Sequence, residues 1–132
     1  MIVRCRSNNV ANLRDTNARE RLLRSIHLPD GDSDLAIGAD YSVQAVETWQ
    51  DGSIMLYLHT VDSNNYPFAY PIEFFEVLDG ALPKDWICVK HGADDEIGGL
   101  LITFPAWAKN RHFFENLIDD GASEIAIYLR HS

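Results

Sequence analysis

The sequence predicts an α+β protein that is mainly β, with a bent antiparallel sheet or a small barrel at its centre. Three observations support this prediction. Short segments of strand composition, separated by turn signals, recur through most of the chain. Helical spacing of apolar residues is clear only in the second half. No internal repeat, low-complexity tract or linker divides the 132 residues, so a single domain over residues 1–132 is expected.

The N-terminal region begins with a strand and continues without a clear pattern. Residues 2–6, IVRCR, alternate apolar and charged side chains as a half-buried strand does. The polar stretch 8–34 is either a long loop or holds one short helix. Such a helix would be capped by Thr16 or Asn17 and ended by Pro29. Its inner side would carry three apolar residues, which are Leu22, Leu23 and Ile26.

A β-hairpin in the middle of the chain is the clearest local prediction. Residues 41–47 alternate along a strand, and strand composition returns at 54–61. The dipeptide Asp51-Gly52 between them favours a tight β-turn. The two strands should therefore pair as neighbours in the sheet.

Three further strands are expected after the hairpin. Residues 62–71 have the composition of a turn region. Strand composition then follows at 72–78, at 85–90 and at 100–104. With the earlier segments, these strands supply the predicted sheet or barrel.

The C-terminal segment predicts a helix and then a closing strand. Proline suits the first helical turn and glycine the end, which places the helix between Pro105 and Gly121. Residues 123–130 alternate apolar and other side chains and indicate a final strand. The helix would then pack between the last two strands. Its apolar positions recur at helical spacing and are Trp107, Phe114, Leu117 and Ile118.

Charge is unevenly distributed along the chain, whose net charge is −9. Residues 1–30 contain six arginines and three acidic residues, a net of +3, whereas residues 31–132 contain five basic and seventeen acidic residues, a net of −12. Nucleic-acid affinity comes largely from lysine and arginine, so an acidic body disfavours a nucleic-acid partner. The same negative charge has two interpretations. It serves solubility alone, or it raises the rate of encounter with a basic partner.

The chain lacks the sequence features of a secreted or membrane protein. Its longest uncharged apolar run, GGLLITFPAWA, is far shorter than the ~20 residues of a membrane span. No apolar segment follows the arginines of MIVRCRSNN as it would in a signal peptide, so a cytoplasmic location and no membrane partner are expected. Cys5 and Cys88 predict two buried, reduced thiols rather than a disulfide.

Motifs for a cofactor or a catalytic centre are weak. DGDSD, residues 30–34, begins like a calcium loop, but the later loop positions lack the required glycine and glutamate. The histidines stand singly and have no zinc-ligand spacing. His59 is expected to be a half-buried, hydrogen-bonded structural histidine, and Cys88 with His91 is a weaker candidate for a nucleophile. We therefore expect no catalytic residue, no cofactor and no metal, and predict that the protein is not an enzyme.

Acidic residues are concentrated in the stretch YPIEFFEVLDGALPKDW, residues 70–86. In a regular strand Glu73 and Glu76 would point to opposite faces, because side chains alternate. A β-bulge or a short helical turn would instead bring them to one side. No third catalytic group accompanies them. We interpret the stretch as core on its aromatic side and exposed on its acidic side, with Asp79 nearby.

Three segments of the chain carry a resemblance: LAIGADYSVQAV, YPFAYPIEFFEVLDGALPKDW and FPAWAKNRHFFENLIDDG. Together they resemble a family of small bacterial proteins of unassigned function. Some members look like immunity proteins of contact-dependent growth inhibition systems, which neutralise the C-terminal domain of a toxin, often a nuclease. The resemblance implies a protein-binding role and brings no catalytic residues with it. The matching positions are Leu35, Ile37, Gly38, Tyr41, Val43, Tyr70, Pro71, Phe75, Glu76, Val77, Asp79, Gly80, Leu82, Trp86, Phe104, Trp107, Ala108, Phe114, Leu117, Asp120 and Gly121.

We therefore predict an immunity protein whose partner is the C-terminal domain of a cognate toxin, with a basic nuclease as the expected kind. An acidic surface can occupy a groove built for phosphates and can speed association. The candidate contacts are all acidic residues, namely Glu73, Glu76, Asp79, Asp94, Asp95, Glu96, Asp119 and Asp120.

Two other functions fit the same sequence. The first is a small ligand-binding or enzymatic β-barrel with an aromatic pocket. The second is a structural or regulatory adaptor, which differs from an immunity protein only in its partner. The arginines at positions 14, 19, 21 and 24 form either a separate contact site or a solvated loop. The aromatic pocket would be lined by Trp49, Tyr57, Tyr66 and Trp86.

Overall fold

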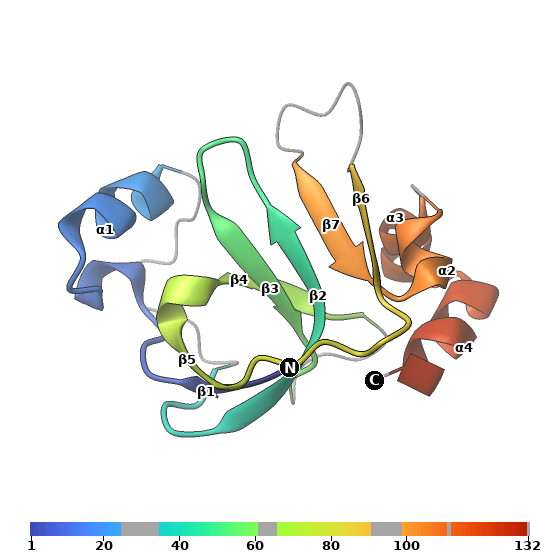
Figure 1. Ribbon diagram of the computed structural model, residues 1–132, viewed down its shortest axis with the longest axis horizontal. Coiled ribbons are helices and arrows are strands. Elements are labelled where there is room, and N and C mark those ends of the chain that lie inside the picture. The colour runs from blue at the N-terminus through green and yellow to red at the C-terminus, as the bar shows by residue number, and fades with distance from the viewer. Residues whose placement is uncertain (25–34, 61–65, 91–98, 111, 132) are drawn as a thin grey trace.

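The structure is a computed structural model that describes residues 1–24, 35–60, 66–90, 99–110 and 112–131 (Figure 1). Strands and helices both contribute, which confirms the α+β class. The strands are β1 (Ile2–Cys5), β2 (Asp40–Thr48), β3 (Ile54–Leu58), β4 (Phe68–Pro71), β5 (Phe75–Asp79), β6 (Ile87–Lys90) and β7 (Leu100–Thr103). The helices are α1 (Thr16–Leu23), α2 (Pro105–Ala108), α3 (Phe113–Ile118) and α4 (Ala122–His131), with short 3-10 turns η1 (Val10–Asn12) and η2 (Ile72–Phe74).

The sheet is antiparallel and centred on the long strand β2. Its order is β4-β3-β2-β1-β5. The first part of β2 pairs with β1, and the last part pairs with β7, which carries β6. The end strands β4 and β5 do not pair with each other, so the described strands form a bent open sheet rather than a barrel.

A register shift in β2 turns its side chains from one face of the sheet to the other. The shift against β3 lies between Val43 and Ala45. Residues two apart on a strand normally share a face. Here Val43 packs in one hydrophobic cluster and Ala45 in the other, because Gln44 is an extra residue. The buried Thr103 hydroxyl donates to the Gln44 carbonyl at 2.8 Å and so satisfies the bulged backbone. The predicted unbroken alternation over 41–47 was therefore wrong.

The hairpin predicted around Asp51-Gly52 is confirmed. Trp49 N–H donates to the Ser53 carbonyl at 2.8 Å, and Gly52 N–H donates to the Trp49 carbonyl at 3.1 Å. Gly52 has a φ of 89°, a conformation that glycine adopts without strain. The Asp51 carboxylate accepts from Ser53 N–H at 2.8 Å. The connection is thus a three-residue loop that ends in a glycine of positive φ.

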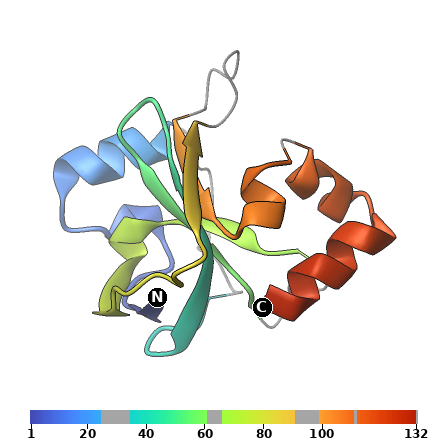
Figure 2. The ribbon, with the colours of Figure 1, turned by 45° about the vertical axis from the view of Figure 1, so that its right-hand side comes forward.

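Two hydrophobic clusters pack on opposite faces of the sheet. The first unites β1, β3, η2 and α1 through residues such as Leu22, Leu56 and Phe74. The second joins Tyr57 to the C-terminal helices. Figures 1 and 2 show α1 on one side of the sheet and α2, α3 and α4 on the other. Trp86 packs against both clusters.

The N-terminal polar stretch forms a helix rather than only a long loop. Asp15 caps α1, since its carboxylate accepts from the N–H groups of residues 17 and 18, so neither Thr16 nor Asn17 is the cap. Leu22 is fully buried, whereas Leu23 is 48% exposed. The helix ends at Leu23, and the predicted Ile26 contact and Pro29 stop lie outside the described residues.

The region between β3 and β6 departs from the prediction in two places. Residues 68–71 form β4, although turn composition was expected there. The predicted strand over 72–78 begins with η2, whose Phe74 is fully buried, and only then continues as β5. The short helical turn considered for this stretch is therefore present.

The C-terminal segment differs most from the prediction. The single helix from Pro105 to Gly121 is two short helices, α2 and α3. The last segment is the helix α4, so the predicted closing strand over 123–130 was wrong. A helix satisfies its backbone hydrogen bonds internally, whereas a strand needs a partner. As a helix, the segment buries Tyr128 completely against the second cluster.

Candidate protein-binding surface

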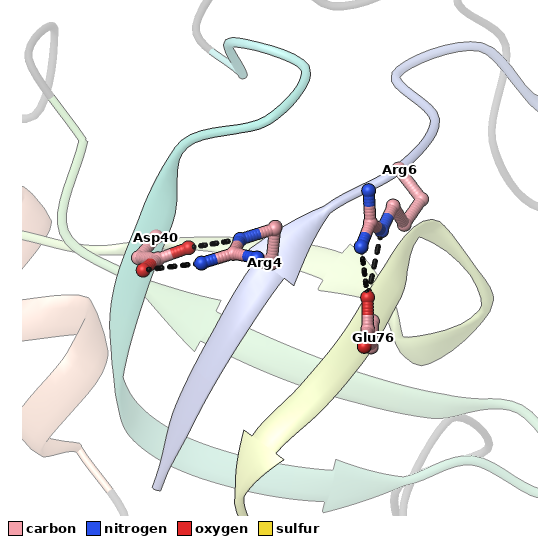
Figure 3. Close-up of polar contacts among 4 residues, drawn as sticks. All are labelled: Arg4, Arg6, Asp40 and Glu76. Atoms are coloured by element: carbon pink, nitrogen blue, oxygen red, sulfur yellow. Dashed lines mark hydrogen bonds and ion pairs between the residues drawn. The ribbon is translucent and has the colours of Figure 1, made fainter.

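Two arginines lie on the exposed face of the sheet, Arg4 in β1 and Arg6 directly after it. Arg4 and Arg6 alternate with Val3 and Cys5, which are fully buried. Figure 3 shows each arginine pointing to a carboxylate on a neighbouring strand. The face therefore carries charges of both signs, held in pairs.

Arg4 pairs with Asp40 of β2 through two hydrogen bonds. Nε donates to Oδ1 at 2.7 Å and Nη2 donates to Oδ2 at 3.2 Å. The hydrogen bond from Arg4 lowers the pKa of Asp40 below its ordinary value. The same bond raises the pKa of Arg4. Because the pair lies in solvent, we expect it to contribute little to the free energy of unfolding.

Arg6 pairs with Glu76 of β5. Its Nε donates to Oε2 at 2.8 Å, and Nη2 contacts the same oxygen (Figure 3). Glu76 was a candidate contact for a partner. The structure shows that its charge is matched by an arginine of the same chain, and its role as a partner contact stays a prediction.

Glu73 pairs with a third arginine, Arg21 of α1, in a different part of the fold from the Arg6–Glu76 pair. Arg21 Nη2 donates to Glu73 Oε2 at 3.0 Å, and Arg21 Nε donates to Ser53 Oγ at 3.1 Å. The other carboxylate oxygen, Oε1, is buried, and no described residue forms a hydrogen bond with it. Although η2 is a helical turn, Glu73 and Glu76 bind separate arginines and do not form a carboxylate pair.

The other candidate acids fall into three groups. Asp79 ends β5 and accepts a hydrogen bond from Ala81 N–H at 2.9 Å. Asp119 and Asp120 are exposed at the end of α3, and within the described part of the chain neither forms an ion pair. The third group lies outside the described residues and consists of Asp94, Asp95 and Glu96.

The end of α3 has a defined backbone geometry. Gly121 N–H donates to the Asn116 carbonyl at 2.7 Å, and Asp120 N–H donates to the Leu117 carbonyl at 3.3 Å. These two bonds form a Schellman ending. Asp120 occupies the left-handed position with a φ of 62°, a place usually taken by glycine. Gly121 does not have a positive φ, although the sequence suggested that it ends the helix.

The described acids do not form one continuous patch. Figures 1 and 2 both show the end strand β5 far from α3, at the opposite end of the molecule. Glu76 and Asp79 of β5 therefore lie on a different part of the surface from Asp119 and Asp120. Sequence reasoning missed the arginines that pair with Glu73 and Glu76. The alternation over 2–6 places Arg4 and Arg6 on the same side of the chain, but the strand register that supplies their partners is not visible in the sequence.

The aromatic residues of the ligand-binding alternative pack mostly on each other. Tyr57 is 8% exposed and meets Trp107 and Phe114 edge to face, with ring centres 5.2 and 5.3 Å apart. Tyr66 meets Phe114 in the same way. Three of the four proposed lining residues thus belong to the second cluster, and the ligand-binding function stays a prediction.

Trp49 is the fourth proposed lining residue, and it lies beside a buried carboxylate. Its indole Nε1 donates to Glu47 Oε1 at 2.7 Å. The Tyr57 hydroxyl donates to the same oxygen at 3.3 Å. Glu47 is 5% exposed, and sequence reasoning did not identify it. A glutamate within an alternating strand gives no signal of burial, because the bulge that turns this part of β2 is a tertiary feature.

The candidate histidine and cysteines occupy ordinary structural positions. His59 is half-buried, and its Nδ1 lies 2.7 Å from the Tyr128 hydroxyl, which agrees with the predicted structural histidine. Burial raises the pKa of Tyr128, so its hydroxyl keeps its proton and can donate to His59. Cys5 is buried and donates to the Ser7 carbonyl. Cys88 is exposed, so the prediction of two buried thiols was wrong for that residue.

The described ranges hold neither a cluster of metal-ligating side chains nor a helix that could span a membrane. Among these residues, no three His, Cys, Asp or Glu side chains gather as they would around a metal ion. None of the helices described is both long and apolar enough to cross a membrane.

The fold defines an α+β protein with a bent, open antiparallel sheet and helices on both faces. Comparison of the sequence with protein-family models gave no match, and searches of curated proteins and of solved structures gave none either.

Proposed function

We propose that this chain is an immunity protein that binds and neutralises a cognate toxin domain, with a basic nuclease as the expected kind. The observation that supports the proposal best is that some carboxylates of the chain are paired with arginines and others are not. Asp119 and Asp120 are exposed and without an ion pair in the described part of the chain, whereas Glu73 and Glu76 are bound to arginines. The resemblance of the sequence to immunity proteins supports the same role.

The proposed contact surface is the end of α3. A partner that used Glu73 or Glu76 would have to compete with Arg21 or Arg6. Asp119 and Asp120 present charge that no arginine of the described chain offsets, so they attract a cationic partner more strongly. Asp94, Asp95 and Glu96 stay part of the proposed surface on sequence grounds alone.

The expected mechanism is electrostatic. A nuclease domain carries a basic groove for phosphates, and an acidic protein surface can fill that groove in place of nucleic acid. Opposite net charges also raise the association rate, and this gain falls as salt screens the charges. Neutralisation of the toxin would then follow from occupation of the groove.

The first experiment is co-expression with the product of the gene immediately upstream. If that product alone stops growth, and the pair grows and co-purifies, the immunity role is supported. If the upstream product neither harms the cell nor binds, the immunity proposal is rejected. This test does not depend on which surface makes the contact.

A second experiment tests the surface with charge-neutralising variants. Asp119→Asn with Asp120→Asn removes two charges, and asparagine also tolerates the left-handed conformation at position 120. The matched control, Glu20→Gln with Asp85→Asn, removes two exposed charges elsewhere. We expect the association rate at low salt to fall by about tenfold in the α3 variant and much less in the control. Equal rates and salt dependence in both variants would reject the α3 surface while leaving the immunity role intact.

The same measurement separates a contact at Asp94, Asp95 and Glu96 from a contact at the end of α3. Neutralising Asp94, Asp95 and Glu96 together should weaken association if that segment contacts the toxin. If only this variant weakens binding, the contact lies there and not at α3.

A further inference from the structure

We draw no further inference here: the strongest candidate, the outer edge of the end strand β5 with its exposed side chains Val77 and Leu78, is a sheet edge for which nothing in the structure shows what covers it.

Discussion

Arg21 on α1 and Glu73 on η2 form an ion pair across 52 residues of sequence, with 3.0 Å between Nη2 and Oε2. The same guanidinium donates to Ser53 in the β2–β3 loop at 3.1 Å. The two charged side chains are 28% and 21% exposed, whereas those of Arg6 and Glu76 are 55% and 49% exposed. Arg21 therefore connects three segments in a setting that water screens only in part.

Replacing Arg21 should cost more stability than replacing Arg6. Arg21→Met leaves a half-buried carboxylate with neither oxygen hydrogen-bonded, so we expect a loss of about 1–3 kcal/mol in the free energy of unfolding. Arg6→Met is the matched control, since it removes an exposed pair worth at most about 1 kcal/mol. Urea unfolding of both variants measures the difference. Equal losses would show that the Arg21 bridge contributes nothing beyond a surface pair.

The Arg4–Asp40 pair should make a small contribution to stability that depends on pH. Because Arg4 lowers the pKa of Asp40 below its ordinary value of 3.8, the contribution is present above that value and is lost as pH falls through the lower, folded-state pKa. Titration of the Asp40 carboxyl by NMR should give a midpoint below 3.8. In Arg4→Gln the midpoint should move up toward the ordinary value. An unchanged midpoint in Arg4→Gln would mean that Arg4 is not the cause.

The end of α3 should be stabilised by glycine at position 120. Asp120 holds a φ of 62°, which costs free energy for any residue with a Cβ atom. We expect Asp120→Gly to raise the free energy of unfolding by roughly 0.5–1 kcal/mol. Gly121→Ala should do the opposite, because its Cβ would lie 2.9 Å from the Asn116 carbonyl oxygen. Thermal unfolding distinguishes the two, and a loss of stability in Asp120→Gly would contradict the left-handed assignment.

The helical state of the last segment can be tested with proline. Ala126 is exposed in the interior of α4, so Ala126→Pro acts on the backbone and should cost about 3 kcal/mol or more. Ala122→Pro is the control, because the first position of a helix tolerates proline. Circular dichroism and thermal unfolding report both effects. If the two variants lose the same stability, the segment is not the helix described.

Local sequence patterns predicted the parts of the fold that depend on near neighbours. Asp51-Gly52 marked the hairpin because turn conformation is set by the residues in the turn. The alternation of IVRCR identified both the strand and the shared face of Arg4 and Arg6. The last segment was predicted wrongly, because its apolar residues at 125, 127 and 129 follow strand spacing. The helix instead buries Tyr128 in the aromatic cluster and leaves Leu129 49% exposed, so contact with that cluster selects the helix.

The sequence by itself determined that this is an acidic α+β protein, with 20 Asp and Glu residues against 11 Lys and Arg residues. Only the tertiary structure decided which of those carboxylates pair with arginines of the same chain. Arg6 and Arg21 lie far from Glu76 and Glu73 in sequence and meet them through strand pairing and helix packing. A charge is neutralised by what lies within a few ångströms of it, and that distance is set by the fold rather than by the order of residues.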